Sequence, residues 1–206
     1  MNFKTEQEQF WAGDFGDEYI GRNKSAQDLA SNLNLFSKAF HQVGIPTSLI
    51  EFGANIGMNL KAVKLLFPAV DLFGIEINKN AAAELVKSMG QENVFNGSIF
   101  NFEVTRKFDV SLIKGVLIHI DPEMLPVVYE KLYSASNKYI LICEYYNSSP
   151  VAKSYRGHED RLFMRDFAGE MLDKYVDLKL VDYGFCYKRD KTFPLDDMTW
   201  FLLEKA

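Results

Sequence analysis

The chain has 206 residues, a formal net charge of -5 and a pI of about 5.3. Hydrophobic residues make up 48% and charged residues 25%, a composition that indicates a globular core and excludes a disordered chain. The acidic balance argues against a broad phosphate-backbone footprint, so nucleic acid is not an expected partner. The length suits one domain, or one domain with a small appendage.

Membrane insertion and secretion are not expected. No run reaches the roughly 18 apolar residues of a membrane span, and residues 1–6 contain no apolar signal core. Cys143 and Cys186 each lie in an apolar stretch, which favours buried, reduced thiols over a disulfide. We therefore expect a cytoplasmic protein without a membrane partner.

Residues 1–47 are predicted to form an N-terminal helical cap or lid. Thr5, followed by Glu8 three residues later, predicts a capped short helix that ends near Trp11. The glycine- and acid-rich stretch 13–21 is predicted to be a loop. Ser25 is expected to cap a longer helix that runs to about residue 41 and buries one apolar face.

The main domain is predicted to span residues 48–206 and to begin with a buried strand, a glycine turn and a helix. Leu49, Ile50 and Phe52 indicate the strand, and the helix stops at Pro68. A glycine turn at this point lets a ligand approach the backbone, where free helical N–H groups favour electronegative atoms.

Strands and helices alternate through the rest of the chain. Further strands are predicted at 70–76, 108–114, 139–144, 176–187 and 198–203, and a short strand followed by a turn is predicted at 94–100. Helices are predicted at 80–89, 121–136 and 166–175. The polar and aromatic stretch 145–161 is predicted to be a long functional loop, and 188–197 a turn-rich linker. This order predicts an α/β fold with a Rossmann-like, doubly wound seven-stranded sheet, mostly parallel with an antiparallel final strand.

Glu76 ends the second predicted strand. An acid at the tip of the second strand of a βαβ unit can accept hydrogen bonds from both hydroxyls of a ribose. The sequence therefore predicts a ligand that contains a ribose. No G-x-x-x-x-G-K-[ST] loop is present, which argues against ATP or GTP.

The motif Glu51-x-Gly53-x-x-x-Gly57, with Glu76 further on, resembles motifs one and two of class I S-adenosylmethionine (SAM) methyltransferases. That family usually has a third glycine where this chain has Asn55. Asn tolerates left-handed backbone angles better than most residues, so the turn is expected to survive. The alternative is any other Rossmann-like strand, turn and helix.

A narrower resemblance covers nearly the whole chain. Residues 9–23, 51–60, 155–158 and 162–167 are similar to the methylases associated with the biosynthesis of pseudaminic acid, a bacterial nonulosonic acid. Asn55 agrees with this subgroup. The resemblance implies a SAM-dependent methyltransferase for a small polar acceptor, such as an amino sugar or a nonulosonic-acid or sugar-nucleotide intermediate. Enzymes of a glycan pathway are then the candidate protein partners.

The candidate cofactor site gathers the tips of the predicted strands and the N-terminal aromatic residues. Ser98 stands where the family often has an acid near the adenine amine, and the Ile99 N–H is expected to reach a ring nitrogen. The cofactor-binding set is Trp11, Tyr19, Arg22, Glu51, Gly53, Asn55, Gly57, Glu76, Ile77, Ser98, Ile99 and Lys114. Trp11 and Tyr19 would cover the cofactor, and Arg22 would clamp a carboxylate. Each of these lid residues also fits a plain packing role.

Two histidines are candidate general bases, because an ordinary histidine pKa of about 6.5 suits proton removal from an acceptor. His119 follows the fourth long strand, and His158 lies in the predicted functional loop. Each also fits a histidine held by a loop carbonyl. Tyr145, Tyr146, Tyr155 and Arg156 are the candidate acceptor-binding residues. No H-x-H, H-E-x-x-H or C-x-x-C cluster is present, so no metal is expected.

Two other functions fit part of the pattern. A nicotinamide-dependent oxidoreductase would share the strand, turn, helix and ribose acid, but the middle glycine and a Tyr-x-x-x-Lys pair are missing. A non-catalytic, cofactor-sensing partner of a glycan-pathway enzyme would share the cofactor site without a functional base.

Overall fold

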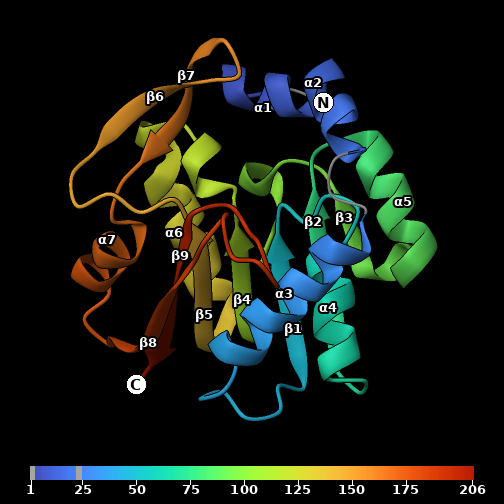
Figure 1. Ribbon diagram of the computed structural model, residues 1–206, viewed down its shortest axis with the longest axis vertical. Helices are drawn as coiled ribbons and strands as arrows, with labels where there is room; N and C mark the ends of the chain where they lie inside the picture. The colour runs from blue at the N-terminus through green and yellow to red at the C-terminus, as the bar shows by residue number, and fades with distance from the viewer. Residues whose placement is uncertain (1–2, 22–24) are drawn as a thin grey trace.

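Figure 1 shows the computed structural model of the chain, which describes residues 3–21 and 25–206, without the side chains of 158–160. The described residues form one seven-stranded sheet in the order β3-β2-β1-β4-β5-β9-β8. Its strands are β1 (Ser48–Phe52), β2 (Asp71–Glu76), β3 (Val94–Asn96), β4 (Phe108–Lys114), β5 (Ser136–Glu144), β8 (Leu178–Cys186) and β9 (Met198–Lys205). Only β9 runs antiparallel to its neighbours in this sheet. The predicted sheet and its antiparallel final strand are confirmed.

The strand order reverses beside β1, which pairs in parallel with β2 on one side and β4 on the other. Leu49 lies opposite Leu72 of β2 and Val110 of β4, so each central strand is buried on both faces. The carboxyl ends of β1, β2 and β4 consequently lie together, and a doubly wound sheet binds its ligands at such a reversal.

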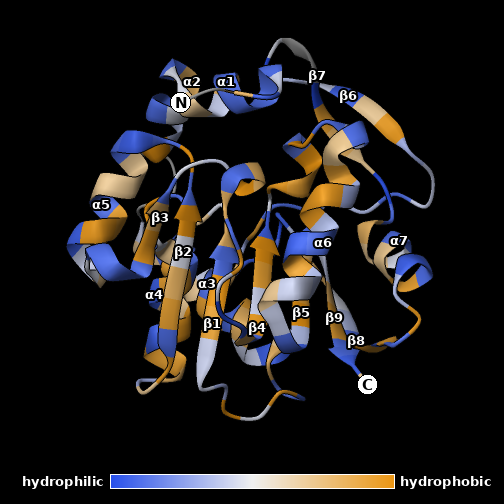
Figure 2. Ribbon diagram, turned by 180° about the vertical axis from the view of Figure 1, so that it is seen from behind, coloured by the Kyte–Doolittle hydropathy of each residue, from blue (hydrophilic) through white to orange (hydrophobic). Residues whose placement is uncertain are grey.

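Helices cover both faces of the sheet (Figure 1). On one face lie α3 (Ala26–Ala39), α4 (Met58–Leu66) and α5 (Lys79–Met89), and on the other lie α6 (Leu125–Ala135) and α7 (Phe167–Lys174). The central strands are largely hydrophobic in Figure 2, as burial between two helical layers requires. Among the described residues, no helix combines the length and apolar character that a membrane span needs.

The predicted N-terminal caps are confirmed. Helix α1 (Glu6–Ala12) begins with a capping box in which Thr5 and Glu8 bond reciprocally to each other's backbone N–H. Ser25 and Asp28 form the same arrangement at the start of α3. The two predicted N-terminal helices differ in their packing, because α3 buries Leu35 and Phe36 in the sheet core whereas α1 lies over the carboxyl ends of the strands.

The loop predicted at 13–21 is wrong, because residues Asp14–Ile20 form a helix, α2. The three glycines of this stretch suggested a loop, although Gly16 serves close packing between helices. A Cβ on Gly16 would lie 1.9 Å from the Trp11 carbonyl oxygen, so only glycine lets α2 fold back against α1. Asp14 and Asp17 stand in the first turn, where negative charge favours a helix.

The loop predicted at 145–161 is also wrong in part, because it contains a hairpin of β6 (Val151–Tyr155) and β7 (His158–Met164). Arg156 (φ 51°) and Gly157 (φ 85°) form its tip, and both have left-handed backbones. A two-residue turn of this kind matches the twist of a hairpin. The hairpin stands apart from the main sheet and lies at the same edge as α1 and α2 (Figure 1).

The short strand and turn predicted at 94–100 are confirmed. β3 ends at Asn96, and a short 3-10 helix, η2 (Ile99–Asn101), follows it. Similarly, the helix predicted from Asp121 begins as the 3-10 turn η4 (Pro122–Met124) before α6. Another turn, η3 (Leu117–His119), follows β4. These turns place side chains at the carboxyl edge of the sheet.

A substitution at Phe36 of α3 tests whether that helix is part of the folded core. Its side chain is fully buried against the sheet, so Phe36→Ala is expected to lower the free energy of unfolding by about 3–5 kcal/mol. Leu65→Ala on the exposed face of α4 is the matched control, with an expected change within about 0.5 kcal/mol. Urea unfolding measures both, and an equally mild effect of the two substitutions would contradict the packing of α3.

Candidate active site

A cavity of about 560 Å³ lies at the carboxyl edge of the sheet, a volume within the range of small-molecule sites. Its floor comes from the residues after β1, β2, β3 and β4. Its cover comes from α1, α2, the tip of the β6–β7 hairpin and the segment between β8 and β9. The predicted site residues that line it are Trp11, Tyr19, Gly53, Asn55, Glu76, Ile77, Ser98, Ile99, Lys114, His119, Tyr145, Tyr155 and Arg156.

The turn after β1 has a left-handed backbone at Gly53 (φ 80°), Asn55 (φ 49°) and Gly57 (φ 83°). Asn55 therefore adopts the conformation that a third glycine would supply. A Cβ on Gly53 would lie 2.5 Å from a methyl carbon of Val116, so this position requires glycine. Gly53 and Asn55 line the cavity, whereas Gly57 caps α4 outside it.

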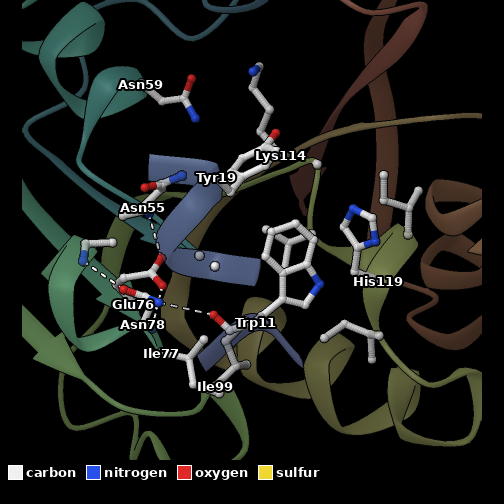
Figure 3. Close-up of a pocket in the computed structure, with 18 of the residues that line it drawn as sticks. Trp11, Tyr19, Asn55, Asn59, Glu76, Ile77, Asn78, Ile99, Lys114 and His119 are labelled. Atoms are coloured by element: carbon white, nitrogen blue, oxygen red, sulfur yellow. Dashed lines mark hydrogen bonds between the residues drawn. The ribbon is translucent and has the colours of Figure 1, made fainter. Parts of the chain in front are cut away.

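Glu76 at the end of β2 holds this turn in place (Figure 3). Its Oε2 accepts a hydrogen bond from the Asn55 N–H and its Oε1 accepts one from the Asn78 N–H, both at 2.7 Å. Burial raises the pKa of Glu76, and these N–H groups oppose the rise. Each carboxylate oxygen keeps a further lone pair, so the side chain can also accept bonds from a ligand in the cavity.

Glu51, two residues before Gly53, is completely buried and does not line the cavity. Its Oε1 accepts a hydrogen bond of 2.6 Å from the Asn59 side chain, which does line it. Burial raises the pKa of Glu51 to about 8, although the positive charge of Lys114 acts in the opposite direction. Glu51 does not reach the cavity itself, but it holds the side chain of Asn59, which does.

Trp11, His119 and Tyr155 form an aromatic group between the cover and the floor. The Trp11 and His119 ring centroids are 4.6 Å apart, and those of His119 and Tyr155 are 4.8 Å apart. Tyr19 stands edge-on to Trp11 at 5.2 Å. Figure 3 shows Trp11 between the Glu76 side of the cavity and His119. The rings of Trp11, His119 and Tyr155 come from three separate elements and enclose the cavity with apolar surface.

His119 is 6% exposed, and its Nδ1 lies 2.6 Å from the Arg161 carbonyl oxygen. A carbonyl only accepts, so Nδ1 carries the proton and Nε2 keeps its lone pair. Burial lowers the pKa of His119 to about 4. The side chain is therefore neutral at pH 7 and a weaker base than the ordinary histidine assumed from the sequence.

The remaining wall of the cavity is polar and charged. Arg156 lies at the hairpin tip with its guanidinium carbon 5.5 Å from the Tyr155 ring centroid. Tyr145 donates a hydrogen bond to Asp196, and this carboxylate and burial both raise the pKa of Tyr145. Lys188 also lines this wall.

Sequence reasoning missed the contribution of the segment between β8 and β9. Lys188, Pro194, Leu195 and Asp196 line the cavity, although 188–197 is predicted only as a linker. The available signal was the predicted antiparallel final strand. The strand before it, β8, then runs parallel to β5, so the carboxyl end of β8 lies at the edge of the site. Asn32 of α3 and Glu8 of α1 also line the cavity without having been singled out as ligands.

Not every predicted site residue reaches the cavity. Tyr146 is 41% exposed and packs its ring 5.8 Å from that of Phe201, outside the cavity lining. Arg22 lies outside the described residues, and the side chain of His158 does too, although its backbone belongs to β7. Within the described part of the chain, no three His, Cys, Asp or Glu side chains gather as metal ligands would.

No protein-family model matches the chain, and no curated protein matches it. Solved structures, by contrast, match this chain. A Burkholderia thailandensis 1,6-didemethyltoxoflavin N1-methyltransferase with bound S-adenosylhomocysteine is 14% identical, with a TM-score of 0.76 over 100% of this chain and 92% of that one. The magnesium protoporphyrin IX methyltransferase of Synechocystis PCC 6803 with bound SAM is 10% identical, with a TM-score of 0.68 over 100% of both chains.

The plantazolicin methyltransferase in complex with S-adenosylhomocysteine is 16% identical, with a TM-score of 0.66 over 97% of this chain and 94% of that one. The three enzymes are named after very different methyl acceptors, whereas all three structures hold SAM or its demethylated product. Identities this low show shared architecture and not shared substrate. The chain therefore has the fold of the class I SAM-dependent methyltransferases.

Proposed function

We propose that this protein transfers a methyl group from SAM to a small polar acceptor. The observation that carries the proposal is the Glu76 carboxylate, which lines the cavity at the reversal of strand order beside the left-handed Gly53–Asn55 turn. This is where the shared fold would hold the ribose of a nucleoside. The turn lacks the G-x-G-x-x-G spacing of a dinucleotide site, which counts against the nicotinamide alternative.

The residues that line the cavity fit SAM. Glu76 offers acceptors to ribose hydroxyls, and Ile77 and Ile99 offer apolar surface to a base. Lys114 and Asn59 offer polar groups to the amino-acid part. When bound, SAM supplies a methyl group that a nucleophile can attack, and the leaving thioether needs no acid. The protein would then contribute mainly by positioning the acceptor against the methyl group, and such positioning can lower the activation barrier by roughly 7–11 kcal/mol.

We further propose that residues 1–47 contribute the cover of this site through α1 and α2. Asp17 of α2 accepts hydrogen bonds from the side chains of Asn78 and Asn80, at 2.8 and 2.9 Å. Arg161 of β7 pairs with Glu6 of α1 at 3.0 Å. The cover is thus joined both to the cofactor side of the sheet and to the hairpin, an arrangement that excludes water from the cavity.

The acceptor that the cavity wall suits best is a hydroxylated acid of sugar size. Arg156 and Lys188 offer positive charge, and Tyr145 and Asp196 offer a hydrogen-bonding pair to hydroxyl or amino groups. The aromatic group of Trp11, His119 and Tyr155 provides faces against which a sugar ring can pack. The resemblance to the pseudaminic acid-associated methylases supports the same class, with enzymes of that pathway as candidate partners.

In this proposal His119 orients the acceptor and receives its proton. The hydrogen bond from Nδ1 to the Arg161 carbonyl fixes the ring, so that Nε2 can accept from an acceptor O–H or N–H. Nε2 would hold the acceptor O–H or N–H in place and would take up its proton as the acceptor is methylated. The side chain of His158 is outside the described residues and receives no role.

Glu76→Gln tests the cofactor assignment. The amide nitrogen would face a backbone N–H and could not accept from a ribose hydroxyl, so affinity for SAM and S-adenosylhomocysteine should fall about 10- to 100-fold. Glu92→Gln, at an exposed residue that does not line the cavity, is the charge-matched control. Calorimetry measures both ligands, and unchanged affinities in Glu76→Gln would refute the ribose role.

His119→Asn tests the role of the ring. Asn keeps a donor near the Arg161 carbonyl but lacks the Nε2 acceptor, so kcat should fall about 10²- to 10⁴-fold with little change in S-adenosylhomocysteine affinity. Exposed His41→Asn is the control. In the unsubstituted protein, kcat/KM should decline only as the pH falls towards about 4, where Nε2 becomes protonated. A decline centred at the ordinary histidine pKa would show that His119 is not held in its buried, neutral form.

Labelled SAM offered with a panel of sugar acids and their uncharged carboxamides tests the acceptor class. The acids should be labelled preferentially, and Arg156→Gln should reduce that preference several-fold because the guanidinium is partly exposed. Exposed Lys153→Gln on β6 is the control from the same hairpin. Labelling of other metabolites only would reject the sugar acid and keep the methyltransferase. Failure of SAM itself to bind would reject the methyltransferase.

A further inference from the structure

The first turn of α1 lies against the end of the cavity that follows β3. Lys4, just before α1, places its Nζ 6.0 Å from the Phe100 ring centroid. Thr5 and Glu8 line the cavity together with Ser98, Ile99 and Phe100. If SAM binds as proposed, this is the end that receives adenine, because it lies beyond Glu76 along the strand tips.

Glu8 is 6% exposed, yet among the described residues only one of its carboxylate oxygens accepts hydrogen bonds. Oε2 accepts hydrogen bonds from the backbone N–H groups of Lys4 and Thr5 as part of the capping box. Oε1 is buried and has no hydrogen-bond partner within residues 3–21 and 25–206. A buried carboxylate oxygen without a donor is costly, so a donor from outside residues 3–21 and 25–206 is expected at this atom.

Helix capping does not account for the second oxygen. The N3 position of a capping box accepts Glu or Gln equally, and one oxygen suffices for the bonds to the N-cap. The cap therefore explains Oε2 and leaves the buried Oε1 unexplained. Negative charge in the first turn also favours α1, but that effect does not require a buried Oε1 without a hydrogen-bond partner.

The segment after β3 does not provide a charged acceptor of its own. Residues 97–102 contain no Asp or Glu, and the Ser98 hydroxyl oxygen already accepts from the Phe100 N–H at 3.0 Å. The base-binding end of the cavity consequently has apolar walls in Ile99 and Phe100 and one free carboxylate oxygen, which comes from the cover.

We propose that Oε1 of Glu8 accepts a hydrogen bond from the exocyclic amine of adenine. The inference rests on the proposed function and assigns recognition of the base to α1 instead of to the segment after β3. This hydrogen bond makes the protein selective for an amino-purine over an oxo-purine, because the oxo group would place an acceptor against the carboxylate. It also links base recognition to the docking of the cover.

Calorimetry with S-adenosylhomocysteine and S-inosylhomocysteine tests the inference without any acceptor. The unsubstituted protein should bind the adenosyl compound about 10- to 100-fold more tightly, the range for one hydrogen bond to a charged group. Glu8→Gln keeps the capping box and can turn an amide N–H towards the base, so the preference should vanish or reverse in favour of the inosyl compound. Exposed Glu18→Gln on α2 removes the same charge from the same cover and should leave the preference unchanged.

The outcomes separate this inference from the function on which it rests. If neither compound binds the unsubstituted protein, the cofactor assignment fails. If the adenosyl compound binds but Glu8→Gln keeps the original preference, the cofactor assignment stands and the role of Glu8 is refuted. Should Glu8→Gln fail to fold, Glu8→Asp withdraws the carboxylate by one methylene and should weaken the preference. An unweakened preference in that variant would also refute the role.

Discussion

The Glu76 carboxylate is the constraint on which the rest of the site depends. By accepting the Asn55 and Asn78 N–H groups, it fixes the left-handed turn after β1 and the start of α5 relative to each other. Asn78 in turn caps α5 through its side-chain oxygen and donates from its amide nitrogen to Asp17 of the cover. One buried acid therefore connects the floor of the cavity to its cover, and its loss would disturb both.

The cover is assembled from pieces far apart in the chain. Helices α1 and α2, the β6–β7 hairpin and the segment between β8 and β9 meet only at the carboxyl edge of the sheet. Arg161 contributes through both its backbone and its side chain, since its carbonyl orients His119 and its guanidinium pairs with Glu6. The shared fold supplies the floor, and these additional elements supply the surfaces that would select an acceptor.

The chemistry expected of such a site needs orientation more than strong acids or bases. His119 is buried among aromatic rings, and burial lowers its pKa to about 4, so it enters the reaction neutral. Glu51 shows the opposite effect, since burial raises its pKa to about 8 beneath the same cavity. Both shifts arise because the interior disfavours charge, whereas Arg156, Lys188 and Asp196 lie in the polar wall of the cavity.

The sequence by itself determined the sheet, the turn after β1 and the acid at the end of β2. These features depend on local signals: apolar runs such as Leu49–Phe52, the positions of Gly53 and Gly57, and capping residues such as Thr5 and Ser25. Only the tertiary structure decided that residues 14–20 are helical, because Gly16 was needed for contact with Trp11, and that Tyr155 ends a strand and Arg156 forms the turn after it. Likewise, the pKa of His119, the free oxygen of Glu8 and the role of Asp196 depend on neighbours distant in the chain, and no local pattern records which residues will surround a side chain once the chain has folded.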